Sequence, residues 1–206
     1  MIKTIFFDFD GVLTTDTNGS GTVCRNLQKL VPDLSFDELY RCYRGRHSLV
    51  TLGKATHADI WSEFCSCVGK NIDIAILYEA LKYAPKNEPM FELCQTLRKN
   101  YKTGIITDNT KERFEALIQE MQLDSCFDFI VLSADIGSTK SESLIFEEAL
   151  RMANAKAEEC VFIDNQQRNL EVPAQMGFHT YWHDDAKNDL ASLRRQLKEW
   201  GVKSID

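Results

Sequence analysis

The stretch Phe6-Phe7-Asp8-Phe9-Asp10-Gly11-Val12-Leu13-Thr14 joins a run of apolar residues to two aspartates and a glycine. The apolar residues from Ile2 to Phe7 predict a buried β-strand, and Gly11 follows where the chain has to turn sharply. In an open parallel sheet, the carboxyl end of such a strand faces the crevice where ligands bind. Asp8 and Asp10 would then share one side of the crevice. Two carboxylates this close favour a cation between them, and Mg²⁺ is the natural oxygen-preferring ion.

Four further runs of strand length follow along the chain, and each is rich in β-branched and aromatic residues. They are Thr103 to Ile106, Phe129 to Leu132, Cys160 to Ile163 and Phe178 to Trp182. Segments of helical period separate most of them. This alternation predicts an α/β fold with a Rossmann-like, doubly wound parallel sheet that helices cover on both faces.

The stretch from about residue 14 to about residue 100 contains helical patterns but no convincing strand, and it is too long for one crossover. Apolar stripes predict helices over Asp37–Tyr43, Ala58–Val68 and Asp73–Ala84, with Thr56 and Asp73 placed as N-caps. We therefore expect three or four packed helices that form a small α-helical cap inserted in the core.

The predicted domain boundaries are 15–88 for the helical cap, and 1–14 with 89–206 for the α/β core. The polar turn Thr17-Asn18-Gly19-Ser20-Gly21 would form the entry to the cap. The segment Pro85-Lys86-Asn87-Glu88-Pro89 would form its exit, because two prolines interrupt helical propagation there.

The composition argues against several kinds of partner. The 206 residues include 24 Lys and Arg against 31 Asp and Glu, so the formal net charge is −7. Such a charge opposes binding to nucleic acid or to anionic lipid, and the chain has no run of about eighteen apolar residues that could span a bilayer. We expect a cytoplasmic protein, a monomer or weak homodimer, that binds neither nucleic acid nor a membrane.

Seven cysteines are scattered through the chain without a CxxC pair, which predicts reduced buried thiols rather than disulfides or a zinc site. His179 and His183 stand four residues apart, but they lie in a strand-like segment where that separation spans about 13 Å. They are therefore not expected to share a metal ion.

Polar side chains also follow the later strands. Thr107 comes after Gly104-Ile105-Ile106, Asp164 closes Val161-Phe162-Ile163-Asp164, and Lys140 lies in Gly137-Ser138-Thr139-Lys140. Parallel topology would gather them at one edge of the sheet beside Asp8 and Asp10. Carboxylates, a hydroxyl and an ammonium group are the set needed for phosphoryl transfer through a covalent acyl phosphate.

From residue 8 to residue 165 the sequence resembles the haloacid dehalogenase (HAD) superfamily, whose four motifs it matches in order. The resemblance implies that Asp8 attacks phosphorus and that Asp10 first protonates the leaving oxygen and then deprotonates the attacking water. It implies that Thr107 and Lys140 bind the transferring group. Asp108, where the family commonly has Asn or Gly, and Asn109 are further candidates for substrate binding. Mg²⁺ would be held by the Asp8 carboxylate, the Asp10 backbone carbonyl and the Asp164 carboxylate.

The leading hypothesis is a Mg²⁺-dependent phosphatase that acts on a small phosphorylated metabolite, for example a sugar phosphate. Arg44, Arg46 and His47 form the one basic cluster of the predicted cap, and Arg44 and Arg46 are candidates for contacts to the substrate. Dehalogenases of the superfamily typically have Tyr at the position of Asp10, which disfavours that chemistry here.

Two alternatives stay open. A phosphomutase would use the same aspartyl phosphate with a substrate hydroxyl as acceptor. A catalytically silent binding module would keep the fold, since Asn165 stands where the family often has a second acid and Ser141 where it often has proline.

Overall fold

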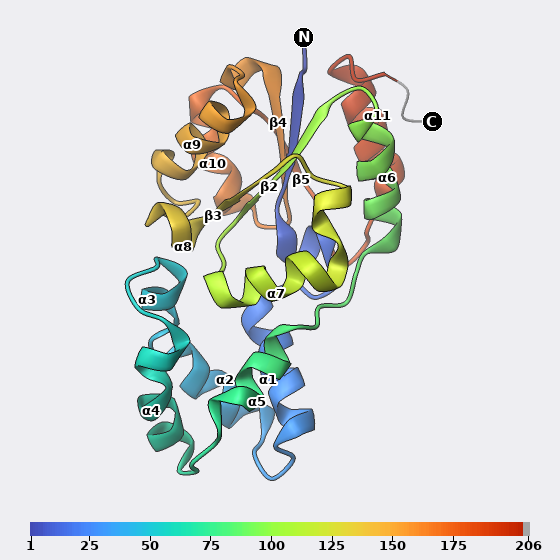
Figure 1. Cartoon of the computed structure of the whole chain (residues 1–206). Coiled ribbons are helices and arrows are strands. Elements are labelled where there is room, and N and C mark those ends of the chain that lie inside the picture. Colours follow the sequence, from blue (N-terminus) through green and yellow to red (C-terminus); the bar gives the residue numbers. More distant parts are fainter. Residues whose placement is uncertain (204–206) are drawn as a thin grey trace.

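The computed structural model describes residues 1–203, so the final three residues of the predicted core range lie outside the described part. Within it, five parallel strands form one sheet in the order β3-β2-β1-β4-β5 (Figure 1). The strands are β1 (Thr4–Phe7), β2 (Lys102–Thr107), β3 (Phe129–Leu132), β4 (Cys160–Asp164) and β5 (His179–Trp182). The predicted α/β fold with a doubly wound parallel sheet is confirmed.

Strand β1 lies at the centre of this sheet and pairs with β2 on one side and β4 on the other. Phe7 is in register with Ile105 of β2 and with Ile163 of β4. The chain continues outward from β2 to β3 and then crosses to β4 and β5, so the strand order reverses beside β1. Ligands of open α/β sheets bind at the carboxyl edge of such a reversal point.

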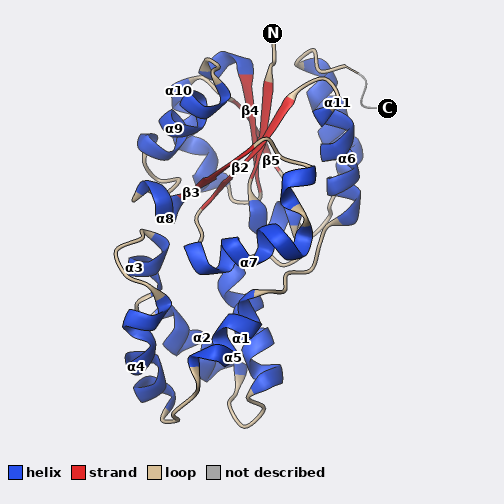
Figure 2. Ribbon diagram, in the orientation of Figure 1, coloured by secondary structure: helices blue, strands red, loops and turns tan. Residues whose placement is uncertain are grey.

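Helices cover both faces of the sheet (Figure 2). One face, with Ile5 and Phe7, packs against α6 (Glu88–Arg98), α7 (Lys111–Met121) and α11 (Leu190–Glu199). The other face, with Phe6 and Phe162, packs against α9 (Ser143–Ala153) and α10 (Glu171–Met176), while the short α8 (Ser133–Ile136) follows β3. No helix in residues 1–203 is long and apolar enough to cross a membrane.

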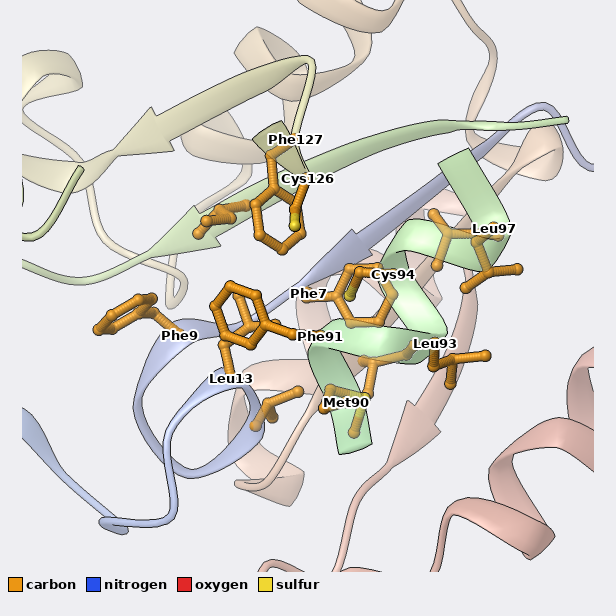
Figure 3. Close-up of a cluster of buried hydrophobic side chains, with 14 of the residues drawn as sticks. Phe7, Phe9, Leu13, Met90, Phe91, Leu93, Cys94, Leu97, Cys126 and Phe127 are labelled. Carbon is orange, nitrogen blue, oxygen red and sulfur yellow. The ribbon is translucent and has the colours of Figure 1, made fainter. Parts of the chain in front are cut away.

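The first of these two clusters supports the turn after β1 (Figure 3). The Phe127 ring centroid lies 6.1 Å from that of Phe7 and 6.0 Å from that of Phe91. Phe9 and Leu13, both fully buried, extend the cluster under the turn. The backbone that carries Asp8 and Asp10 therefore rests on packed aromatic side chains.

The segment between β1 and α6 folds into helices with an apolar cluster of their own, which lie together beyond the carboxyl edge of the sheet (Figure 1). Its helices are α1 (Gly19–Leu30), α2 (Phe36–Arg44), α3 (His47–Thr51), α4 (His57–Val68) and α5 (Ile74–Leu81). Thr56 and Asp73 are N-caps as predicted. Two of the five helices, α1 and α3, are not among the helices that the sequence placed.

The two linkers to these helices differ from the prediction. Asn18 caps α1 by accepting a hydrogen bond from the Gly21 N–H (2.8 Å), so Gly19, Ser20 and Gly21 form the first turn of a helix. On the return side only Pro85 precedes the core, because Pro89 lies in the first turn of α6, where its missing N–H costs nothing.

The prediction that all seven cysteines are reduced is wrong for two of them. Cys42 near the end of α2 and Cys67 near the end of α4 form a disulfide, with Cα atoms 5.7 Å apart. The two cysteines meet because these two helices pack together, and their spacing along the sequence does not predict that contact. The other five cysteines are free thiols.

Candidate active site

Asp8 is the first residue after β1, and its N–H donates to the Ile163 carbonyl (2.8 Å), which prolongs the sheet by one hydrogen bond. A wide turn over Phe9–Leu13 follows, closed by the Thr14 N–H that donates to the Phe9 carbonyl (3.1 Å). Gly11 takes φ +84° in this turn, and a Cβ there would lie 2.1 Å from Asn165 Nδ2. Only glycine fits at position 11, so this turn holds the backbone of Asp8 and Asp10 in one conformation.

Lys140 lies between two buried carboxylates. Its Nζ is 2.7 Å from Asp8 Oδ1 and 2.7 Å from Asp164 Oδ2, and the three side chains are at most 7% exposed. Burial and the nearby Asp164 raise the pKa of Asp8, which Lys140 opposes. Burial works against the Lys140 charge, but Asp8 and Asp164 outweigh it and raise the pKa of Lys140. The ammonium thus offsets charge that two close carboxylates could not otherwise retain.

The loop that carries Lys140 is fixed by Asp108. Asp108 Oδ1 accepts a hydrogen bond from the Lys140 N–H (2.9 Å), so this carboxylate binds the backbone of the loop. Burial raises the pKa of Asp108, an effect that Lys140 opposes. The hydrogen bond restrains the loop at a place where the sequence has Ser141 instead of proline.

Asp164 is itself held from a second side. Its Oδ1 accepts the Gln166 N–H (2.7 Å), and Asn169 Nδ2 lies 3.2 Å from Oδ1 and 3.1 Å from Oδ2. The carboxylate is fully buried, and these donors fix its orientation.

Asp10 has its own cation, Arg113 of α7. Arg113 Nη2 donates to Asp10 Oδ1 (2.8 Å) and Nη1 donates to Oδ2 (2.8 Å), while Asn109 Nδ2 donates to Oδ2 (3.0 Å). Sequence reasoning missed Arg113. A signal was present, since Arg113 precedes Leu117 by four residues and therefore lies on the apolar stripe of its helix, where an arginine needs a buried partner.

These residues surround a cavity of about 330 Å³. The core side of its lining includes the predicted residues Asp8, Asp10, Thr107, Asp108, Asn109 and Lys140, together with Arg113, Gln166, Arg168 and Asn169. The helical segment contributes Asn18, Gly19, Ser20, Tyr43, Arg44, His47, Ser48, Thr51 and Leu52. Asp164 is not in the lining of the cavity, but it contacts Lys140 and Asn169, which are.

The predicted basic cluster of the cap divides between two places. Arg44 and His47 line the cavity, whereas Arg46 lies outside its lining and pairs with Glu63 on α4 (2.9 Å). Burial and the neighbouring His57 lower the pKa of His47 to about 3, so its ring is neutral near pH 7. Arg44 is thus the cation that the helices present to the cavity.

The donor set fits a hard divalent cation. Asp8 and Asp164 place one carboxylate oxygen each at 2.7 Å from the same ammonium group, and both side chains are buried. Residues 1–203 contain no cluster of three or more His, Cys, Asp or Glu side chains arranged as a metal cage. Mg²⁺ commonly takes only one or two carboxylates and keeps several waters, so this set suits Mg²⁺ better than a transition metal.

The sheet topology, the carboxylate-rich edge and the covering helices together define a Rossmann-like α/β fold with an inserted helical cap. The family model of haloacid dehalogenase-like hydrolases matches residues 2–177, and the chain belongs to this family.

Two relatives illustrate the range of the family. The chain is 29% identical over 178 residues to a glyceraldehyde 3-phosphate phosphatase from Methanothermobacter thermautotrophicus, which covers 81% of this chain and 78% of that protein. It is 30% identical over 136 residues to bifunctional epoxide hydrolase 2 from Rattus norvegicus, which covers 63% of this chain but only 24% of the rat protein. The chain thus spans about a quarter of that relative's length.

Solved structures share the fold. A HAD family enzyme from Bacteroides thetaiotaomicron, in complex with magnesium and inorganic phosphate, superimposes with a TM-score of 0.74 at 19% identity, over 88% of this chain and 94% of that one. An L-2-haloacid dehalogenase from Xanthobacter autotrophicus gives a TM-score of 0.69 at 14% identity, over 98% and 85% of the two chains. At these identities the similarity concerns the fold alone.

Proposed function

We propose that this HAD hydrolase is a Mg²⁺-dependent phosphatase that hydrolyses a small phosphomonoester through an aspartyl phosphate on Asp8. One observation carries the proposal. Two carboxylates two residues apart line the same cavity in different surroundings, Asp8 beside Lys140 and Asp10 on Arg113. Distinct surroundings give two carboxylates distinct roles, here a nucleophile and a proton carrier.

In the first step an oxygen of Asp8 attacks the phosphorus of the ester. Within residues 1–203, the hydrogen bonds to this carboxylate, from the Phe9 N–H and Lys140, both reach Oδ1 and leave Oδ2 for the attack. The bond between phosphorus and the ester oxygen breaks, and Asp10 gives the departing oxygen its proton. Thr107 and Lys140 hold the oxygens of the phosphoryl group during the transfer.

In the second step water attacks the same phosphorus and gives a proton to Asp10. The bond between phosphorus and Asp8 breaks, which releases inorganic phosphate and restores the carboxylate. When bound by the Asp8 and Asp164 carboxylates and the Asp10 backbone carbonyl, Mg²⁺ supplies positive charge that offsets the charge of the incoming phosphate.

The relatives and residue 10 favour phosphate over halide chemistry. The family includes both dehalogenases and phosphatases, among them a pyrophosphatase from Bacillus cereus that is 24% identical over 177 residues. An alkoxide leaving group needs a proton and a halide does not, so a carboxyl group at position 10 is useful only for the former.

The size and lining of the cavity favour a small metabolite. About 330 Å³ accommodates a phosphoryl group with a short polar body. Arg44 provides one cation at the roof, suited to a hydroxyl or a second anionic group of the substrate. A protein or nucleic acid substrate would not fit beneath the helices in this arrangement.

The test is phosphate release from a panel of phosphomonoesters, with glycerol phosphates, hexose phosphates and 4-nitrophenyl phosphate, in the presence of Mg²⁺. We expect turnover that a chelator abolishes and that Asp8→Asn lowers on the order of 10³-fold or more, the scale seen when a nucleophile is removed. Asp135→Asn, an exposed aspartate after β3, is the matched control and should keep full activity.

Three results would overturn the proposal. Asp8→Asn could turn over as fast as the wild type. Hexose 1-phosphate could be isomerised without release of phosphate, which would indicate a mutase. Chloride could be released from 2-chloropropionate, which would indicate a dehalogenase.

A further inference from the structure

We propose that Arg113 is a positioning residue that holds the Asp10 carboxylate in place for its proton transfers. The inference rests on the proposed phosphatase function and extends it to a residue outside the four family motifs. Arg113 contacts Asp10 and lines the same cavity, yet the proposed steps require nothing of it directly.

The contact is bidentate and part of a closed set of hydrogen bonds. Each guanidinium Nη atom donates to a different Asp10 oxygen, both at 2.8 Å. Asn109 joins the two residues, since its Nδ2 donates to Asp10 Oδ2 (3.0 Å) and its Oδ1 accepts from Arg113 Nη1 (2.9 Å). A carboxylate held at both oxygens has one orientation, which a single point charge would not impose.

Arg113 is in turn fixed from the core side and from the cap side. Its Cζ lies 5.7 Å from the centroid of the Phe9 ring, which packs edge-on against Phe114. On the other side, a Cβ on Gly19 would lie 2.3 Å from Arg113 Nη1 and 2.6 Å from Asp10 Oδ2. Gly19, the first residue of α1, therefore lies directly against the ion pair, and a larger residue would not fit there. The pair is enclosed between the core and the cap.

Stability alone gives a weak reason for this arrangement. The Arg113 side chain is 2% exposed and the Asp10 side chain 13% exposed, so both charges have lost most of their hydration. Replacing such a pair with apolar residues is often neutral or stabilising, so its presence at the wall of a cavity indicates a role in function.

The guanidinium cannot itself carry the proton. Burial opposes the Arg113 charge, but Asp10 outweighs it and raises the pKa of Arg113. Arg113 stays charged throughout and acts only through its partner. Within residues 1–203, Oδ2 of Asp10 accepts two hydrogen bonds and Oδ1 accepts one, so Arg113 and Asn109 together hold both oxygens of the carboxylate.

The test uses the leaving group. We compare kcat/KM of the wild type, Arg113→Lys and Arg113→Met on two substrates, an alkyl phosphomonoester from the panel and 2,4-dinitrophenyl phosphate, whose leaving group needs no proton. If Arg113 acts through Asp10, Arg113→Met should lose on the order of 10²-fold on the alkyl ester and less than about 5-fold on the dinitrophenyl ester. Arg113→Lys should fall between, because lysine supplies charge without the fork.

A double-mutant cycle makes the test independent of any loss of folding. In an Asp10→Asn background, Arg113→Met should cost less than about 3-fold on the alkyl ester, because the partner is already gone. Arg151→Met is the control, an exposed arginine that pairs with Glu148 and should leave both substrates unaffected. Should Arg113→Met fail to fold, Arg113→Lys alone and in the Asp10→Asn background carries the comparison.

Equal losses on the two substrates, a loss confined to KM, or full additivity with Asp10→Asn would each overturn the role of Arg113. These results are separable from failure of the proposed function. In that case the wild type itself would not hydrolyse dinitrophenyl phosphate faster than Asp8→Asn.

Discussion

His57 of α4 and Glu112 of α7 join the cap to the core. The His57 N–H donates to Glu112 Oε1 (2.9 Å), and the ring Nδ1 lies 3.2 Å from Oε2. On the far side of the ring, Nε2 lies 3.1 Å from the hydroxyl of Tyr43, a residue that lines the cavity. Glu112 precedes Arg113 in sequence, so consecutive residues of one helix bind the cap and Asp10.

A second contact closes the cap near α3. Ser133 Oγ donates to the Thr51 carbonyl (2.8 Å) and accepts the Asn109 N–H (3.0 Å), which ties α3 to the loop after β2. A Cβ on Gly53 would lie 2.1 Å from the Ala134 carbonyl oxygen, so the backbones of the cap and the core are in close contact here. The structure therefore has the cap closed over the site.

Glu112→Gln should weaken the cap contact. Burial raises the pKa of Glu112, but the contacts from the His57 ring and N–H outweigh it and bring the pKa to about 2. We expect a several-fold rise in KM and a loss of about 1 kcal/mol of stability at pH 7. This figure is the usual contribution of a hydrogen bond to a charged group, reduced because Glu112 is partly exposed.

The stabilisation by Glu112 should depend on pH and should be lost in acid. The pKa of Glu112 falls from 4.5 to about 2 on folding, so its stabilisation is complete above about pH 4.5 and disappears as pH falls through about 2. Denaturation of wild type and Glu112→Gln should differ at pH 7 and converge near pH 2. Glu115→Gln, exposed on the same helix, should show no such difference. A gap that persists at pH 2 would contradict the prediction.

Reduction should loosen the cap. The Cys42–Cys67 bridge closes a separation of 25 residues, and its loss from the oxidised chain should cost about 3 kcal/mol by loop entropy. Denaturation with and without reductant measures this, with Cys42→Ser/Cys67→Ser as the reduced mimic and Cys65→Ser as control. A thiol titration of the unfolded, unreduced chain should find five thiols, and seven would show that the bridge is absent.

The sheet could be predicted because each strand is a short run rich in β-branched and aromatic residues, such as Ile2 to Phe7, and runs of that length and composition are typical of strands. The helix α3 was not, since five residues from His47 to Thr51 are too few to show a period. Helix α1 was missed because Gly19-Ser20-Gly21 has the composition of a turn. The closeness of Gly19 to Arg113 explains the glycine at position 19, and only the tertiary structure shows it.

The candidate site also contains residues that the sequence predicts and one that it does not. Asp8, Thr107 and Asp164 lie at the carboxyl ends of strands, so parallel topology alone predicts that they gather. Lys140 comes after α8, and the hydrogen bond from its N–H to Asp108 brings its loop to the same edge. Arg113 lies inside a helix, and its contact with Asp10 joins residues 103 positions apart, which no local pattern encodes.

Gly104→Ala should destabilise the sheet. A Cβ on Gly104 would lie 2.5 Å from two atoms of the Phe129 ring and 2.9 Å from the Phe6 ring. Overpacking of this kind typically costs about 1–3 kcal/mol, which chemical denaturation would measure. Gly104→Ala/Phe129→Leu should recover part of the loss, because it removes the ring in closest contact. A double variant no more stable than Gly104→Ala alone would contradict this account.

Asn165→Asp tests whether the acid that the family often has beside its metal-binding aspartate would serve as a metal ligand here. Asn165 is 8% exposed, its Nδ2 donates to the Thr17 carbonyl (3.4 Å), and it lies against Gly11 rather than in the lining of the cavity. An aspartate would set a carboxylate oxygen against the Thr17 carbonyl oxygen and bury a charge without a partner. We expect a loss of about 1–3 kcal/mol in stability and less than about a twofold change in the Mg²⁺ concentration for half-maximal activity.

The matched variant for this comparison is Asp164→Asn, which removes a carboxylate 2.7 Å from Lys140 and should raise the Mg²⁺ requirement at least about tenfold. Mg²⁺ titrations of phosphate release with the three proteins give both numbers. A tenfold lower Mg²⁺ requirement in Asn165→Asp would mean that position 165 reaches the ion after all. The packing of Asn165 against Gly11 would then have to open when the metal binds, and the wide turn that carries Asp8 and Asp10 would have to move with it.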